Sequence, residues 1–421
     1  MRFSIQLIFS YVLKMEVAIT SEEKTFLEWE GIKLSYAYKA LGNELRIVPF
    51  GLLHQNGIEE FDITLSHTSD YPYFFKTNNS NFGFDLFSAS FFLATRYEEY
   101  WPHKRDQHNR FSANQSTAFK NQFLHLPVIN LWANELLNLL KTHFGTKIED
   151  NRSYALLPTI DVDSAFAYRE KGLVRTAGAY ARSIFQGKLN EINKRTQSII
   201  GTSKDPYDVF DRLIKIQKKN DLNVIYFFLV GNYGLNDKNV AHYSQKFQAL
   251  IKHVNDYSTV ALHPSFASNT EPEKVKMEKE RLSQIVHNSI NQSRQHFLII
   301  HLPTTYRNLI NAEIEHDYSM GYPEEPGFRA SICSPYPFYD LDLEQETNLM
   351  IHPFCFMEAT YKYYKKENFE EIKSQIKTLS DTVKKVKGEF CILWHNDSLS
   401  ETHGWENWSP LFEEMIEIAK E

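Results

Sequence analysis

The sequence feature that most constrains the fold is a regular alternation of apolar runs and amphipathic segments that begins at residue 154. Apolar, strand-like runs cover residues 154–161, 223–231, 258–264, 293–300, 348–356 and 389–397. Helical periodicity covers residues 206–220, 243–256, 271–288, 303–315 and 368–388. Strands and helices that alternate in this way build a parallel sheet. We therefore expect an α/β fold with a closed or nearly closed (β/α) barrel over residues 151–421.

The residues before this alternation predict a second, smaller α/β domain over residues 1–150. A first amphipathic helix is expected over residues 3–13, and residues 44–53 are strand-like. The apolar stretch 84–101 predicts a buried helix, and residues 131–145 predict an amphipathic helix that stops at Gly145. The charged stretch 145–153 then marks the boundary between the two predicted domains.

Composition excludes several classes of protein. The chain of 421 residues has a net charge of −7 and shows no basic stripe, so nucleic acid is not an expected partner. Its three cysteines are far apart, which argues against a disulfide framework or a cysteine zinc site. No apolar run approaches the roughly 20 residues of a transmembrane helix. The N-terminal apolar stretch lacks a signal-peptide cleavage site, so we expect a cytoplasmic protein.

Polar side chains with metal-binding or acid–base chemistry recur where the predicted strands end. They are Asp161, Asp163, His263, Arg294, His296, His352, His395 and Asp397. A single histidine on an apolar strand is more often a hydrogen-bonded core residue than a ligand. In parallel α/β folds, however, the carboxyl ends of the strands meet at one rim, where the chemistry is done. Several such residues at one rim favour a shared site.

The segment TIDVD places two carboxylates, Asp161 and Asp163, on the same side of a strand end. Neighbouring carboxylates repel each other unless a cation offsets their charge. One aspartate and two histidines make a suitable set of ligands for a divalent ion, with zinc favoured over cobalt, nickel or iron. The second aspartate can then accept a proton from water, and a distant histidine can protonate a leaving amine.

Four segments, TIDVD, HPSFAS, SRQHF and LWHND, together resemble the motifs of the polysaccharide deacetylases, the NodB-homology carbohydrate esterases. The resemblance implies a distorted (β/α) barrel of the NodB type. It also implies that Asp161 is the catalytic base, that Asp163 and His263 bind the metal, and that His395 is the general acid. Arg294 falls where that family has an arginine that orients the base.

The chain departs from that family at one metal ligand. The family motif has a second histidine four residues after the first, but this chain has Ala267 there. His296, at the end of the next predicted strand, is the expected replacement, and His352 is the alternative third ligand.

The resemblance extends to substrate contacts and to the N-terminal region. Tyr322 and Arg329 lie in the loop segment where the family places its substrate pocket, and Trp394 precedes His395, so these three are expected substrate-binding residues. The segment SASFFLATRYEEYWPHKRDQHNRF is similar to an uncharacterised domain that precedes such barrels in proteins from bacterial surface-polysaccharide gene clusters.

The expected function is therefore metal-dependent hydrolysis of an N-acetyl group on a sugar or on a surface-polysaccharide precursor. Two alternatives stay open at this point. The missing second histidine also fits an inactive, deacetylase-like sugar-binding or scaffold protein. An amide hydrolase with a substrate other than a sugar is the third hypothesis.

Overall fold

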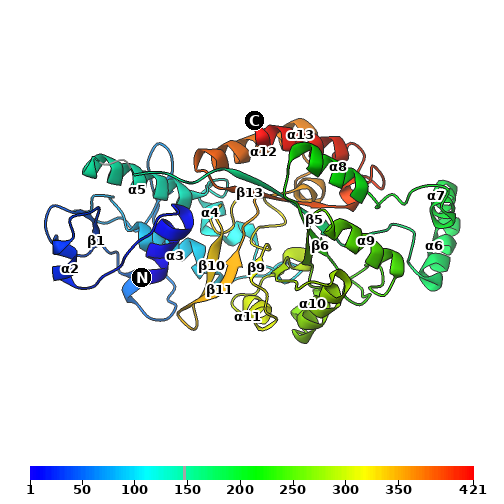
Figure 1. Cartoon of the computed structure of the whole chain (residues 1–421), viewed down its shortest axis with the longest axis horizontal. Coiled ribbons are helices and arrows are strands. Elements are labelled where there is room, and N and C mark those ends of the chain that lie inside the picture. Colours follow the sequence, from blue (N-terminus) through cyan, green and yellow to red (C-terminus); the bar gives the residue numbers. More distant parts are fainter. Residues whose placement is uncertain (146–147) are drawn as a thin grey trace.

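The computed structural model describes residues 1–145 and 148–421, and a nine-stranded sheet forms its centre (Figure 1). The strand order is β10-β11-β9-β8-β7-β6-β5-β13-β12. The strands are β5 (Ala155–Val162), β6 (Ile225–Phe228), β7 (Thr259–Leu262), β8 (Gln292–Ser293), β9 (His316–Asp317), β10 (Tyr336–Asp340), β11 (Gln345–Ile351), β12 (Phe356–Met357) and β13 (Glu389–His395). All neighbouring strands pair in parallel except β10 and β11. The predicted α/β class is confirmed, and within the described residues the barrel stays open between β10 and β12.

Helices follow the strands along the chain and cover the sheet. They are α8 (Phe210–Asn220), α9 (Gln245–Asn255), α10 (Glu273–Val286), α11 (Thr304–Asn311), α12 (Phe369–Lys385) and α13 (Trp408–Lys420). In Figure 1, α8, α12 and α13 lie on one side of the sheet, and α10 and α11 lie on the other. The first five of these helices were predicted from periodicity. A capping box formed by Asn368 and Glu371 fixes the start of α12.

Strand register brings the carboxyl ends of the parallel strands to one edge of the sheet. β5 pairs with β6 on one side and with β13 on the other, and Asp161 lies directly opposite His395. Leu262, the last residue of β7, pairs with Ser293 of β8. The polar residues that follow these strands therefore share one rim, as the sequence predicted.

Two local predictions are wrong for identifiable physical reasons. Residues 293–300 were expected to form a strand, but Phe297 and Leu298 have positive φ angles of 62° and 55°, so the chain turns at His296. The second is the start of the helix expected over residues 206–220. That helix begins at Phe210, and the Asp205 carboxylate accepts hydrogen bonds from backbone N–H groups of residues 167–169.

The N-terminal third contains short elements around a buried helix. They are α1 (Arg2–Gln6), α2 (Glu23–Glu28), β1 (Leu34–Tyr36), β2 (Leu45–Ile47), β3 (Ser66–His67), β4 (Pro72–Tyr73), α3 (Leu86–Ala94), α4 (Thr117–Lys120) and α5 (Val128–Phe144). α1 continues as a wider helical turn to Val12, which matches the predicted first helix. Gly145 ends α5 in the left-handed conformation, where glycine has no steric penalty. The domain boundary at residue 150 stays a prediction.

A buried ion cluster joins the N-terminal third to the rest of the chain. Arg96 bonds Glu99 at 2.7 Å and Glu98 at 2.8 Å. Arg329 forms a two-point contact with the same Glu99, at 3.0 and 2.7 Å, and Arg96 also donates to the Tyr322 hydroxyl. Burial opposes ionisation of Glu99, but the two arginines outweigh it and lower its pKa to about 2. The depressed pKa stabilises the fold above pH about 4.5, and this contribution is lost as the pH falls toward 2.

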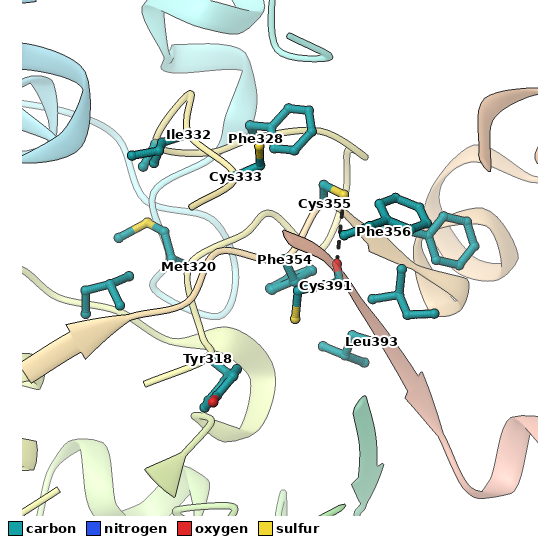
Figure 2. Close-up of a cluster of buried hydrophobic side chains, with 14 of the residues drawn as sticks. Tyr318, Met320, Phe328, Ile332, Cys333, Phe354, Cys355, Phe356, Cys391 and Leu393 are labelled. Carbon is teal, nitrogen blue, oxygen red and sulfur yellow. Dashed lines mark hydrogen bonds between the residues drawn. The ribbon is translucent and has the colours of Figure 1, made fainter. Parts of the chain in front are cut away.

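The three cysteines lie inside the apolar core, as Figure 2 shows. Cys333, Cys355 and Cys391 are free thiols that lie among aromatic and aliphatic side chains. The Cys355 thiol donates to the backbone oxygen of Cys391 at 3.8 Å. Burial raises the pKa of Cys391 to about 12, so its thiol stays neutral and packs as a small apolar group.

No helix among residues 1–145 and 148–421 combines the length and the apolar character needed to cross a membrane.

Replacing Arg329 with alanine should lower the melting temperature sharply, because it leaves the buried Glu99 carboxylate partly unpaired. Removing one partner of a buried ion pair costs about 3–5 kcal/mol. Lys377→Ala is the control, since Lys377 and Asp381 form an exposed pair that should contribute below about 1 kcal/mol. Equal shifts in the two variants, measured by thermal unfolding at pH 7, would contradict a stabilising role for the cluster.

Candidate metal centre

Asp163, His263 and His296 form a group that could hold a metal ion. Their ligand atoms all lie within 4.8 Å of one another. Asp163 follows β5, His263 follows β7, and His296 lies in the turn after β8, so the group joins three strand ends. Nε2 of His263 is 3.2 Å from Oδ1 of Asp163, and Nε2 of His296 is 3.5 Å from Oδ2.

Each histidine is oriented by a partner on its other ring nitrogen. Nδ1 of His263 lies 2.6 Å from the backbone oxygen of Arg294, and Nδ1 of His296 lies 2.9 Å from the Asp237 carboxylate. Both partners can only accept, so each Nδ1 must carry the proton. The two Nε2 atoms then face Asp163, and each becomes a metal ligand once a bound cation displaces any proton that it carries. This is the arrangement that metal-binding histidines usually have.

The electrostatics of the group also fit a cation. Oδ1 of Asp163 is buried and has no hydrogen-bond donor within the described part of the chain. Burial raises the pKa of Asp163, but the positive charge of His296 outweighs it and holds that pKa well below its usual value. Burial lowers the pKa of His296, whereas Asp163 and Asp237 outweigh it and raise the pKa to about 9. One carboxylate and two imidazoles match the preferences of zinc, and a three-ligand protein site keeps a position open.

Asp161 lies beside this group and is held by Arg294. The guanidinium Nη1 of Arg294 donates to Oδ1 of Asp161 at 2.9 Å and to the Thr159 hydroxyl at 2.6 Å. Its Nε donates to the backbone oxygen of Tyr318. The other carboxylate oxygen, Oδ2, lies 3.7 Å from Nε2 of His263. One oxygen of Asp161 is therefore fixed, and the other faces the candidate metal centre.

His395 lies on the neighbouring strand, opposite Asp161, and is oriented by Glu358. Oε1 of Glu358 accepts hydrogen bonds from the His395 backbone N–H at 2.9 Å and from Nδ1 at 2.8 Å. Burial lowers the pKa of His395, but the carboxylates of Glu358, Asp163 and Asp161 outweigh it and raise that pKa well above its usual value. His395 therefore carries a proton at neutral pH, with Nε2 free of the Glu358 contact.

Two acidic residues that orient histidines of the site were not predicted from the sequence. Asp237 lies in the long loop after β6, and Glu358 directly follows the two-residue strand β12. Neither position follows from a motif, although an acidic residue in the apolar run PFCFMEA is a weak signal for Glu358. Asp237 also accepts the backbone N–H of Ala267. The position that lacks the expected histidine thus supports the residue that orients His296.

Several predicted site residues lie elsewhere. Tyr322 and Arg329 belong to the buried ion cluster, where they bond Arg96 and Glu99. Trp394 points to the opposite face of β13 from His395, because side chains alternate along a strand, and it packs against α13. All three are at most 1% exposed, so the expectation that they contact substrate is wrong for this structure.

His352, the alternative third ligand, is also outside the metal group. It bonds His316 at 3.0 Å and Glu389 at 3.4 Å. The group that the structure assembles instead contains His296.

Comparisons with known proteins give a family model for the N-terminal residues and several similar solved structures. Residues 1–145 match a family model described as "Family of unknown function (DUF7033)". Among curated proteins, no sequence matches. A solved structure from Mycobacterium smegmatis described as a polysaccharide deacetylase is 14% identical, with a TM-score of 0.41, and the match covers 65% of this chain and 85% of the other.

Two further solved structures are similar at the same level. The polysaccharide deacetylase Bc1974 from Bacillus cereus is 11% identical, with a TM-score of 0.31, over 63% of this chain and 88% of that one. The PuuE allantoinase is 12% identical, with a TM-score of 0.40, over 66% and 89%. The similarity to solved polysaccharide deacetylase structures is at low identity, and the family model of unknown function matches residues 1–145 alone.

Metal binding should depend on the residues of the group. Asp163→Ala and His263→Ala should abolish stoichiometric zinc, and Asp237→Asn should weaken binding by about 10–100-fold because it loosens His296. Zinc content after chelation and reloading measures both effects. His352→Ala is the matched control and should keep full metal content. Full metal in His296→Ala, together with loss in His352→Ala, would show that the assignment of the third ligand is wrong.

Proposed function

We propose that the protein is a metal-dependent hydrolase that removes the acetyl group from an N-acetylated sugar. One observation carries the proposal. A candidate metal group, a carboxylate held by a buried arginine and a histidine held by a buried glutamate lie together at one rim of the sheet. The choice of a sugar precursor as substrate rests on the resemblance of the motifs to those of polysaccharide deacetylases.

Asp163, His263 and His296 would hold a divalent ion, whose charge supplies the Lewis acidity that amide hydrolysis needs. The fixed Nδ1 partners of both histidines keep their Nε2 atoms in place, so the site is preorganised before the substrate arrives.

Asp161 is the proposed general base. Its Oδ1 is held by Arg294, so Oδ2 is the atom placed to accept a proton from the attacking water. Arg294 acts through Asp161 and is a positioning residue. The water oxygen then bonds to the acyl carbon while the proton stays on Asp161.

His395 is the proposed general acid. Glu358 holds Nδ1, which leaves the Nε2 proton for the amine nitrogen as the C–N bond breaks. The products are acetate and the free amine of the sugar. Asp161 and His395 are cross-strand partners on adjacent strands, so a scissile bond held between them would be within reach of both the proposed base and the proposed acid.

The departure at Ala267 gives little support to a non-catalytic protein. His296 lies where a third ligand is needed, and Ala267 contributes its backbone N–H to the support of His296 through Asp237. These contacts support His296, from a different segment of the chain, as the third ligand.

Asp161→Asn should keep the metal and lose turnover by about 10²–10⁴-fold, because an amide cannot accept the water proton. Release of acetate from an N-acetylated oligosaccharide, together with zinc content, measures this. Asp211→Asn, at an exposed aspartate of α8, is the control. An Asp161→Asn variant that stays fully active would disprove the role as base. Wild-type protein that is fully loaded with metal but releases no acetate from any N-acetylated sugar would favour an inactive relative or another amide substrate.

His395→Gln and Glu358→Gln should reduce hydrolysis of an acetamide far more than hydrolysis of p-nitrophenyl acetate. The nitrophenolate leaves without protonation, so it has no need of an acid. A purely structural role for Glu358 would instead reduce both activities by the same factor. Equal losses on the two substrates in both variants would therefore contradict the assignment of His395 as the acid.

A further inference from the structure

Two helices that the sequence reading did not predict project from the rim of the sheet. α6 (Leu173–Phe185) and α7 (Leu189–Ile200) form a hairpin at the far edge of the molecule in Figure 1. The hairpin is inserted directly after β5, the strand that carries Asp161. Its base is fixed by Asp205, whose carboxylate accepts hydrogen bonds from the backbone before α6 and from Ser198 of α7.

The apolar face of α6 points to solvent. Leu173, Val174, Ala177, Ala181, Ile184 and Phe185 follow helical spacing along one stripe, and all of them are exposed. Leu173 is 90%, Val174 88% and Phe185 93% exposed, and Leu189 in the following helix is 73% exposed. The polar face turns inward instead, where Tyr180 bonds Thr196 of α7 at 2.8 Å. A surface helix of a globular protein normally has the opposite orientation, so this stripe indicates a docking face.

The charge of the hairpin indicates what docks there. Residues 172–204 contain six Lys or Arg and one Glu, although the whole chain has a net charge of −7. The negative net charge of the whole chain hides this local excess of positive charge. Among the residues that the structure describes, Arg182, Lys188 and Lys194 form no ion pair and are exposed. A second copy of the hairpin carries the same positive charge, so electrostatic repulsion would oppose its docking on this face.

We propose that the α6–α7 hairpin docks the protein on the surface of an anionic lipid membrane. Apolar side chains on one face of a helix, flanked by lysine and arginine, are the composition of helices that lie in the membrane interface. Phe185, Ile184 and Leu189 would enter the interface from the turn of the hairpin. Arg182, Lys188 and Lys194 would contact lipid phosphates.

The position of the hairpin would bring the rim of the sheet close to the lipid surface. Asn396, next to His395, donates from its side chain to the backbone oxygens of Ser164 and Tyr207 on either side of the insertion. Arg175 of α6 bonds the backbone of Asn239, in the loop that also carries Asp237. The docking face and the candidate metal centre thus share supporting segments. The proposal nevertheless does not rest on the proposed function, because it concerns binding alone.

Co-sedimentation of the full chain with lipid vesicles tests the proposal. Wild-type protein should bind vesicles of phosphatidylglycerol and phosphatidylcholine, and it should bind vesicles of phosphatidylcholine alone much more weakly. Added salt should weaken binding to the anionic vesicles. Leu173→Ser combined with Phe185→Ser should reduce binding about tenfold or more. Arg182→Glu combined with Lys188→Glu should reduce it as well.

Leu343→Ser is the matched control, because Leu343 is also exposed but lies in the turn between β10 and β11, and it should leave vesicle binding unchanged. Metal content should be the same in all these variants, which separates loss of docking from damage to the metal centre. The proposal would be overturned if wild-type protein did not bind anionic vesicles, or if the hairpin variants bound them as strongly as wild type. A dimer in light scattering that Leu173→Ser and Phe185→Ser convert to a monomer, without vesicle binding, would identify a protein interface instead.

Discussion

Arg294 is the residue on which the arrangement of the candidate site depends. Its guanidinium is fully buried, lies over the ring of Phe227 at 4.5 Å and bonds Asp161, while its backbone oxygen fixes Nδ1 of His263. One residue at the end of β8 therefore orients both a proposed base and a proposed ligand. A buried guanidinium needs such partners, because an unpaired charge in the core is strongly unfavourable. The requirement to pair Arg294 holds Asp161 in place even though a second carboxylate, Asp163, lies two residues away.

The same principle recurs around the rim. Each imidazole of the site has one nitrogen fixed by a buried acceptor, which is the Arg294 carbonyl for His263, Asp237 for His296 and Glu358 for His395. These acceptors come from different connections of the fold. The parallel sheet supplies the common edge, and the loops beyond it supply the groups that orient the histidines. Position 267 lacks the expected histidine, and the turn after β8 brings His296 into the candidate metal group.

Much of the fold could be predicted because periodicity reports burial. The strands at 154–161 and 389–397 and the helix at 368–388 were predicted close to their true positions, and Asp161, Asp163, His263 and His395 followed from strand ends. Asp237 and Glu358 could not be predicted, since long-range hydrogen bonds leave no local pattern. Tyr322 and Arg329 were predicted as substrate contacts from their place in a loop segment, and Trp394 from its place beside His395. All three side chains are buried, because neither kind of position shows whether a side chain packs in the core. Helix α6 shows a further limit of periodicity. A periodic pattern locates an apolar stripe on a helix, but it does not show whether that stripe faces the core or the solvent.

The most direct test of the metal centre is anomalous diffraction from crystals of the zinc- or cobalt-loaded protein. We expect one strong peak between the Asp163 carboxylate, Nε2 of His263 and Nε2 of His296, at about 2.0–2.2 Å from each. The absence of a peak at this position in fully loaded protein would contradict it. So would a single peak bound by His316 and His352.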